Sequence, residues 1–310
     1  MEIGISVTSA HPRDVDARTA ANWVVERAAA VAAAGFASFS IGDHHATPAH
    51  YVQNVPMLGR CLAELGSMPV IPLFLLPLWH PLLLAEQMGT LAAIAQGPLH
   101  CILAVGRDDE QFPALGVSAR ERRGRMEEAI PLLRRLFSED HIDHAGEFWQ
   151  FENVSINPKP PQIPEFWIGA NVGVAIDRAA RVADGWLASP GETPEQLTEK
   201  MAHFGEALSS NDRASEISTF PVRRDVYIGE SDAEAAAATG PLLDGGYRGI
   251  DPSSLIVGGP ETAVAALQDL EARGFNHTLI RFLPVGQDKI LKSIARIGSD
   301  VIPELRTTGG

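Results

Sequence analysis

The chain has 310 residues, a formal net charge of -14 and a hydrophobic content of 45%. This length allows one large α/β domain or two smaller ones, and we expect a single domain over residues 1–310. The negative charge argues against a nucleic acid or an anionic membrane as a partner. It does not exclude a small anionic ligand, because a local basic cluster can bind one.

Targeting signals are weak in this sequence. The stretch MEIGISVTS has no basic start followed by a long apolar run, so no signal peptide is predicted. The most apolar run, Pro69–Leu84, is interrupted by prolines and a histidine and is not expected to cross a membrane. Cys61 and Cys101 lie in apolar surroundings, which favours buried free thiols over a disulfide. We therefore expect a cytoplasmic protein.

Short apolar runs alternate along the chain with longer segments of helical periodicity. The apolar runs predict strands over Ile3–Val7, Phe39–Gly42, Val70–Leu75, Cys101–Val105, Phe166–Ile168, Trp186–Ala188, Val222–Ile228 and Thr278–Leu283. The periodic segments predict helices over Thr19–Ala34, Pro56–Leu65, Leu82–Ala95, Ala119–Phe137, Val174–Val182, Pro194–Ser209, Asp232–Ala238, Pro260–Arg273 and Asp288–Leu305.

About eight strands, each followed by a helix, predict an α/β fold of the closed (β/α)8 type, the TIM barrel. A doubly wound open sheet is the alternative, and the absence of GxGxxG after the first strand weakens it. The segment Ser138–Glu165 is predicted to be an insertion before the fifth strand. A loop of that length is often part of a substrate rim.

Local signals support several of these boundaries. Thr193 before Pro194 is typical of a helix start, and Pro81 after His80 fits a first helical position. Gly35 and Gly274 each follow a predicted helix, where a glycine commonly ends it. Pro72 removes a backbone donor from the third predicted strand and so indicates a bulge or a distortion there.

The segment Phe166–Trp186 carries the clearest site signal. A short apolar strand passes through Gly169, Ala170, Asn171, Val172 and Gly173 into a predicted helix. The free N–H groups and the dipole at such a helix start suit a phosphate. The alternative is an ordinary strand-to-helix turn in which the glycines serve only the backbone geometry.

Polar side chains follow other strands at the same end of the predicted barrel, where barrel enzymes hold their sites. His44 and His45 follow the second strand, and at most one of them needs to face the mouth. His44 could donate to a bound oxygen or move a proton, or it could simply pack at the strand end. No metal-ligand spacing is present, so no metal site is predicted.

Arginine suits phosphate because its planar fork makes two parallel charge-assisted bonds. Arg107 follows the fourth strand, and its alternative role is an ion pair with the acidic residues next to it. Arg125 belongs to a basic cluster at the start of the Ala119–Phe137 helix and is the member chosen as an anion ligand.

A set of segments, in this order and spacing, resembles the bacterial luciferase-like monooxygenases, a flavin- or deazaflavin-dependent (β/α)8 family. The resemblance covers nearly the whole chain, from Met1 to about Arg306. The segments are Gly35–Phe39 with Asp43–His45, Leu76–Gln87, Val105–Arg107 with Gln111–Gly116, Gly146–Trp149, Asn157–Pro160, the glycine loop with Arg178–Arg181 and Asp184–Trp186, and Val257–Glu261.

The resemblance implies a flavin across the carboxyl-terminal mouth, with its phosphate at Asn171–Gly173 and Arg107. It implies that Pro72-Leu73, or Leu73 with the next residue, matches a non-proline cis peptide behind the flavin ring. It also implies that His44 lies near the reactive ring face. Three departures from the family pattern put the pocket chemistry in question: Ala92, Pro98 and Asp108.

Three functions remain open. The first is a monooxygenase that uses reduced FMN and O2 to oxidise a small organic substrate, with a separate reductase supplying the flavin. The second is a hydride-transfer oxidoreductase that uses coenzyme F-420. The acidic residues after Arg107 favour FMN, because the long anionic tail of F-420 calls for extra basic residues. The third is a non-catalytic flavin-binding barrel. The resemblance also implies a homodimer, whereas the substrate and the reductase cannot be identified from the sequence.

Overall fold

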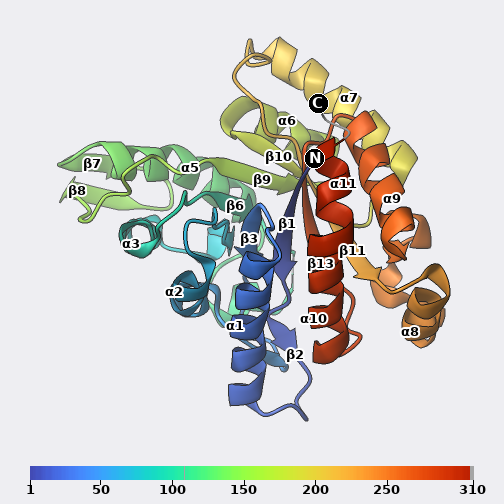
Figure 1. The fold of residues 1–310 in the computed structure, drawn as a ribbon. Coiled ribbons are helices and arrows are strands. Elements are labelled where there is room, and N and C mark those ends of the chain that lie inside the picture. Colours follow the sequence, from blue (N-terminus) through green and yellow to red (C-terminus); the bar gives the residue numbers. More distant parts are fainter. Residues whose placement is uncertain (108, 308–310) are drawn as a thin grey trace.

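A computed structural model describes residues 1–107 and 109–307, and it places a parallel barrel inside a ring of helices (Figure 1). Every predicted strand is present. The barrel strands are β1 (Glu2–Val7), β3 (Ser38–Ile41), β5 (Leu73–Leu75), β6 (Cys101–Ala104), β9 (Phe166–Ala170), β10 (Gly185–Ala188), β11 (Pro221–Ile228) and β13 (His277–Phe282). Their order is β3-β1-β13-β11-β10-β9-β6-β5. The predicted TIM barrel is therefore confirmed.

The barrel closes through a short join between its two end strands. Phe39 donates its N–H to the carbonyl of Pro69 at 2.9 Å, and Ile71 donates to the carbonyl of Phe39 at 2.8 Å. The regular ladder of β5 begins only at Leu73, after Pro72. The distortion predicted at Pro72 is thus present, and it shortens the third strand.

The helices lie mostly where periodicity predicts them. Their bounds are α1 (Ala17–Ala33), α2 (Asn54–Leu65), α3 (Pro81–Ile94), α4 (Gln111–Ala114), α5 (Arg122–Ser138), α6 (Gly173–Val182), α7 (Pro194–Ser210), α8 (Asp232–Asp244), α9 (Pro260–Ala272), α10 (Gln287–Arg296) and α11 (Ile302–Thr307). Thr193 forms the capping box of α7, and His80 with Pro81 starts α3. A π-helical turn at Ile297–Val301 separates α10 from α11, which the sequence predicts as one helix.

Three short pairings add to the barrel. The ribbon β2 (Ala10–His11) with β4 (His50–Tyr51) is antiparallel, and β12 (Ile256–Gly258) pairs with the end of β11. The predicted insertion Ser138–Glu165 forms a hairpin of β7 (Ile142–Ala145) and β8 (Gln150–Val154). It projects beyond α5 (Figure 1).

Apolar side chains fill the lower barrel. Leu73, Ile102 and Trp167 are paired in register on neighbouring strands, and they form an inner cluster with Ile71, Leu187 and Leu279. Gly185 lies beside Trp167 in the next strand, and a Cβ there would approach the indole Cδ1 to 2.9 Å. The absence of a side chain at Gly185 leaves room for the Trp167 indole. That indole and the rest of the inner cluster fill the barrel below its mouth.

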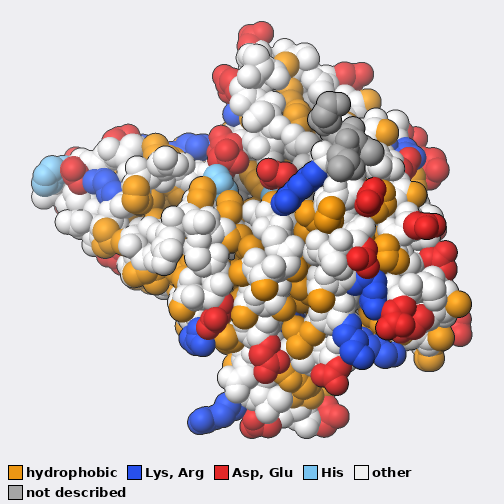
Figure 2. Space-filling view, in the orientation of Figure 1, with side chains coloured by type: hydrophobic (Ala, Val, Ile, Leu, Met, Phe, Trp, Pro, Cys, Tyr) orange, Lys and Arg blue, Asp and Glu red, His pale blue; other side chains and the backbone are white. Residues whose placement is uncertain are grey.

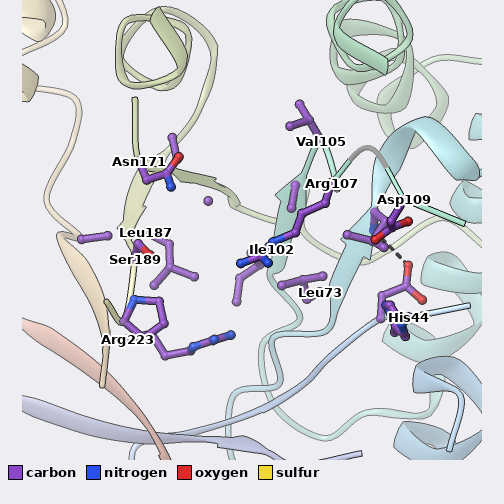
Figure 3. A pocket seen from close by; sticks show the side chains of 18 of the residues that line it. His44, Leu73, Ile102, Val105, Arg107, Asp109, Asn171, Leu187, Ser189 and Arg223 are labelled. Carbon is purple, nitrogen blue, oxygen red and sulfur yellow. Dashed lines mark hydrogen bonds between the residues drawn. The ribbon is translucent and has the colours of Figure 1, made fainter. Parts of the chain in front are cut away.

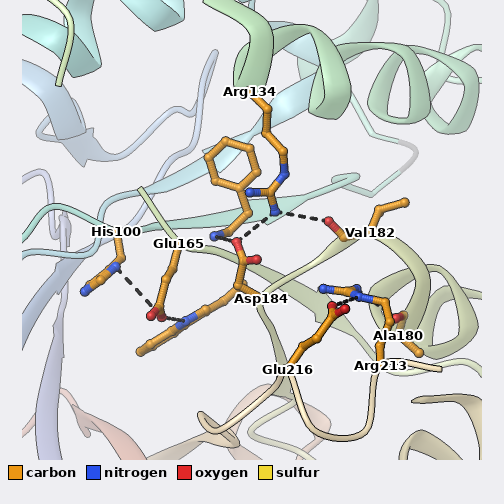
Figure 4. A network of polar contacts seen from close by, with 10 residues as sticks. His100, Arg134, Glu165, Ala180, Val182, Asp184, Arg213 and Glu216 are labelled. Carbon is orange, nitrogen blue, oxygen red and sulfur yellow. Dashed lines mark hydrogen bonds and ion pairs between the residues drawn. The ribbon is translucent and has the colours of Figure 1, made fainter. Parts of the chain in front are cut away.

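A polar network holds β9, α5 and the α6–β10 connection together (Figure 4). Asp184 accepts hydrogen bonds from the Phe166 N–H and from Arg134 Nη2, both at 2.8 Å. Arg134 also lies over the Phe166 ring, 4.6 Å from its centroid. The network fixes the strand that leads to the predicted phosphate loop. Cys61 and Cys101 are buried free thiols, as predicted.

Candidate functional site

A cavity of about 550 Å³ opens at the carboxyl ends of the barrel strands (Figure 3). Leu75 and Ala104, one layer above Leu73 and Ile102, line it together with Gly169 and with Leu187 of the inner cluster. Leu187 and Gly169 are in register on β10 and β9, so both face the barrel interior. The volume lies within the range of small-molecule and cofactor sites.

Gly169 gives the cavity part of its depth. A Cβ at this position would have no heavy atom within 4 Å, because the space in front of it is the cavity. Neither Gly169 nor Gly173 has a positive φ, so these glycines do not serve a left-handed turn. The alternative of purely geometric glycines does not describe Gly169, whose missing side chain leaves open space.

The predicted phosphate loop lies at one end of the cavity. Gly169, Ala170 and Asn171 line it, and Val172 and Gly173 follow as the N-cap and first residue of α6. The first amide groups of a helix have no carbonyl one turn earlier to bind, so they are available to a ligand. The loop is anchored from below by Trp186, whose indole N–H donates to the Ala170 carbonyl at 2.9 Å.

Arg107 extends into the cavity from the end of β6, with Asn171 on the opposite wall (Figure 3). No ion pair joins Arg107 to a described carboxylate. Asp109 instead accepts two bonds from the Gln111 side-chain amide, at 3.1 and 3.0 Å. The departure at Asp108 lies outside the described residues.

The adjacent histidines separate into two environments. His44 lines the cavity, and its ring lies 5.6 Å from that of Tyr51. His45 turns away, with Nε2 3.1 Å from Asp43 Oδ1, and the hydrogen bond to Asp43 raises the pKa of His45. Asp43 also accepts from the Leu75 N–H and from the Trp79 indole at 2.9 and 2.8 Å. This buried carboxylate therefore fixes the turn that presents His44.

Two expectations need correction. Arg125 does not line the cavity: it pairs with Glu121 at 3.0 Å and lies over the Phe148 and Trp149 rings, because α5 directs it toward the β7–β8 hairpin. The peptide bonds at Pro72-Leu73 and after Leu73 are trans, since the cis bond found in the described residues is Asn157-Pro158. Leu73 itself lines the cavity, and Pro72 accepts a bond from the Ile102 N–H behind it.

The segment Ser138–Glu165 does not form a substrate rim. None of its residues lines the cavity, because the hairpin packs along the outside of α5. Two departures from the family pattern also lie away from the cavity lining. Ala92 packs against the core, and the Pro98 carbonyl accepts from the Val70 N–H at 2.9 Å.

A set of arginines at the mouth was not predicted from the sequence. Arg223 lines the cavity from β11, and Arg248 lines it from a short 3-10 turn at Tyr247–Gly249. Arg281 on β13 donates to Asp225, which also accepts from the Tyr247 hydroxyl at 3.0 Å. A signal was present, since Arg223 and Asp225 occupy alternate positions of a buried strand and so face the same side.

A second cavity, of about 240 Å³, adjoins the first and shares with it Asp43, His44, Leu73, Arg223 and Arg248. The ends of β1 and β3 and the Tyr51 side chain form part of its wall. The mouth therefore offers two neighbouring spaces with His44 on both. In the described part of the chain, no group of three or more His, Cys, Asp or Glu side chains is placed to bind a metal, and no helix is both long and apolar enough to span a bilayer.

Comparison with known proteins identifies relatives of two cofactor types. Residues 1–254 match the family model described as luciferase-like monooxygenase. An FMNH2-dependent dimethylsulfone monooxygenase of Pseudomonas fluorescens is 29% identical over 62% of this chain and 52% of its own. The match thus spans about half the length of that relative. An F-420-dependent glucose-6-phosphate dehydrogenase of Amycolatopsis mediterranei is 24% identical over 79% of this chain and 80% of its own.

Solved structures agree on the fold. The monooxygenase RslO1 from Streptomyces bottropensis superposes with a TM-score of 0.85 at 20% identity, covering 98% of this chain and 99% of its own. At that identity the likeness concerns the barrel alone.

Proposed function

Because the chain belongs to the luciferase-like monooxygenase family, we propose that it uses reduced FMN and O2 to oxidise a small organic substrate. The observation that carries the proposal is a cavity with groups suited to bind a phosphate at one end and an apolar floor. Arg107 and Asn171, the residue before the N-cap of α6, lie at that end, and Leu73, Ile102 and Leu187 form the floor.

These residues fit a flavin nucleotide. Arg107 and the amide groups at the start of α6 would hold the phosphate through charge-assisted hydrogen bonds. The apolar floor would hold the ring system, and the open space in front of Gly169 leaves room for a flat group. Bound reduced flavin would supply the electrons that activate O2.

The side chains around the reacting region would control protons and water. His44 lies on the wall shared by both cavities, where it can donate to a bound oxygen or move a proton. Burial raises the pKa of Tyr51 to about 12, so its phenol stays protonated beside His44. Leu73 and Leu75 exclude water from this wall, which would suppress side reactions.

Hydride transfer with coenzyme F-420 is the second candidate, and the Amycolatopsis relative favours it. Arg223 and Arg248 at the mouth also favour it, since the anionic tail of F-420 calls for basic residues there. The charges next to Arg107 argue for FMN. Asp109 and Glu110 follow it, and a polyanionic tail beside these carboxylates would be repelled. A separate flavin reductase is part of the proposal, since two-component monooxygenases need one.

The decisive experiment is an anaerobic titration of the purified protein with reduced FMN and, in parallel, with reduced F-420. Tighter binding of reduced FMN, followed by substrate-dependent O2 uptake, is expected. Preference for F-420 would replace the monooxygenase with a hydride-transfer enzyme. Binding of neither cofactor by folded protein would leave the non-catalytic barrel as the function.

A further inference from the structure

Three arginines surround the second cavity. Arg223, Arg248 and Arg281 come from β11, from the turn at Tyr247–Gly249 and from β13, and all three line this space. Segments far apart in the sequence thus deliver three cations to one place, although the protein carries a net charge of -14.

The local carboxylates do not balance this charge. Asp225 is fully buried and serves two of the arginines: Arg281 donates to it, and Arg248 Nη1 lies 3.4 Å from its Oδ2. Asp43 also lines the cavity, so two carboxylates, Asp43 and Asp225, face three guanidinium groups there. Positive charge therefore remains in excess at the second cavity.

Arg223 is the unpaired member. Its Nε is buried without a hydrogen-bond partner among the described residues, and no described carboxylate pairs with it. Burial, and then the charge of Arg281, lowers the pKa of Arg223 to about 10. A partly buried guanidinium without an ion-pair partner is costly, and an anion in the cavity would lower that cost. Figure 3 shows Arg223 extending into the cavity from a different wall than Arg107.

The backbone of Arg248 also points to a ligand site. Arg248 has a φ of 52°, in the left-handed region that non-glycine residues rarely adopt, between Tyr247 and Gly249. Such strained positions cost of order 1–3 kcal/mol and cluster at ligand sites. The strain here directs a guanidinium toward Asp225 and the cavity.

We propose that Arg223, Arg248 and Arg281 form a second anion subsite that recognises a carboxylate, sulfonate or phosphate group on the organic substrate. This inference rests on the proposed function, because it assigns the first cavity to the flavin and the second to the substrate. In the proposed function the flavin phosphate would lie at Arg107 and the loop before α6, whereas Arg223 and Arg248 reach the first cavity from other elements. The substrate class is therefore a small organic anion, bound with His44 on the wall between the two spaces.

The test compares probes that differ only in charge. Calorimetry at fixed, low ionic strength measures the binding of hexanesulfonate, hexanoate and the neutral hexanamide, with and without reduced FMN. We expect both anions to bind at least tenfold more tightly than hexanamide. Equal affinities for all three probes would overturn the proposal.

Two variants locate the site. Arg223→Met and Arg248→Met should each weaken the binding of the anions tenfold or more, leaving hexanamide unchanged. Arg248 is 41% exposed, so its replacement keeps a folded protein available if Arg223→Met is unstable in a thermal melt. Arg60→Met, whose side chain pairs with Glu64 on α2, is the matched control and should change nothing.

The cofactor titrations separate failure of this inference from failure of the proposed function. Arg223→Met should bind reduced FMN normally, whereas Arg107→Ala should lose it and keep anion binding. If Arg223→Met loses reduced FMN instead, the arginines serve the cofactor and the inference is wrong. If wild type binds the anions through Arg223 but binds no flavin, the anion subsite stands and the monooxygenase proposal fails.

Discussion

Arg107 is the side chain on which the phosphate end depends most. In Arg107→Ala, binding of reduced FMN should weaken by about 1.5–3 kcal/mol, or roughly 10- to 150-fold, because a charge-assisted hydrogen bond is lost. Anaerobic fluorescence titration measures this. Arg60→Ala removes an exposed arginine far from the cavity and should have no effect. Unchanged affinity in Arg107→Ala would remove Arg107 from the site.

His44 should matter for turnover more than for flavin affinity. Once a substrate is identified by O2 uptake, His44→Ala should reduce kcat by roughly 100-fold or more, the usual size of a general acid–base contribution. His80→Ala, which alters a histidine at the start of α3 outside the cavity lining, serves as the control. Equal turnover in His44→Ala would mean that this ring only packs against Tyr51.

Single residues show where sequence reasoning succeeds and where it stops. The position of Arg107 followed from its place directly after a strand. Position at a strand end did not separate His44 from His45, and only the family resemblance favoured His44. The physical reason is that Asp43, Leu75 and Trp79 come together in space. The prediction that Arg125 binds an anion was wrong for the same reason. The aromatic rings that it contacts belong to the β7–β8 hairpin, which was not predicted from the sequence.

At the scale of elements, Glu128 attaches the β7–β8 hairpin to the barrel. Its carboxylate accepts from the Phe148 and Trp149 N–H groups at 3.0 and 3.1 Å and contacts His144 Nε2 at 2.9 Å. Glu128→Ala should speed amide hydrogen exchange across residues 142–154 by tenfold or more, with the barrel strands unchanged. Glu147→Ala, an exposed neighbour, is the control, and equal exchange in both variants would contradict the anchoring role.

The β2–β4 ribbon should make stability depend on pH through His11. Burial, then the charges of Arg27 and His50, lowers the pKa of His11 to about 4, against about 6.5 unfolded. The unfolded chain takes up a proton first as the pH falls. This contribution is therefore complete above about pH 6.5 and is lost toward pH 4.

Urea unfolding at pH 7.5 and 4.5 tests this. Wild type should lose on the order of 2 kcal/mol more than His11→Phe between the two conditions, since phenylalanine keeps a ring and cannot titrate. Identical curves for wild type and His11→Phe would show that His11 titrates normally.

The sequence predicted which segments are helices and which are strands more accurately than it predicted where they end. The α8 helix continues past Pro241 to Asp244, whereas the sequence predicts an end at Ala238, because a proline in a helical pattern usually stops it. The sequence correctly predicted an insertion at Ser138–Glu165, but the prediction that it forms part of a substrate rim was wrong. A segment between a helix end and the next strand starts at the amino-terminal side of the barrel, away from the mouth.

At the scale of the whole molecule, periodicity was sufficient for the barrel because each strand and helix carries its own pattern. The arginine subsite was not predictable in this way, since its members come from β11, a short turn and β13. The negative charge is dispersed on the face drawn in Figure 2, where acidic side chains are spread over the surface with basic ones among them. A local excess of positive charge at the mouth is compatible with a net charge of -14.

We also expect a homodimer. Leu83 and Ile94 are each 55% exposed on α3, and they lie eleven residues, or about three turns, apart on the same side. Next to Ile94 a largely apolar groove of about 320 Å³ runs between α2 and α3. Light scattering should give twice the monomer mass, and Ile94→Lys should reduce it to the monomer.

The matched control is Ile163→Lys, which changes an equally apolar side chain, 48% exposed, outside α2 and α3. It should remain dimeric. A wild-type protein of monomer mass at micromolar concentration would contradict the expectation.

Side chains of increasing size at position 169 would measure the depth of the cavity. A Cβ at Gly169 would point into open space, and the strand position itself is fixed by its register with Leu187. A series of alanine, serine, valine and leucine at this one position would shorten the cavity stepwise and leave the barrel wall in place. The size at which a ligand is first rejected would then report how deeply that ligand sits, read directly from a set of otherwise identical proteins.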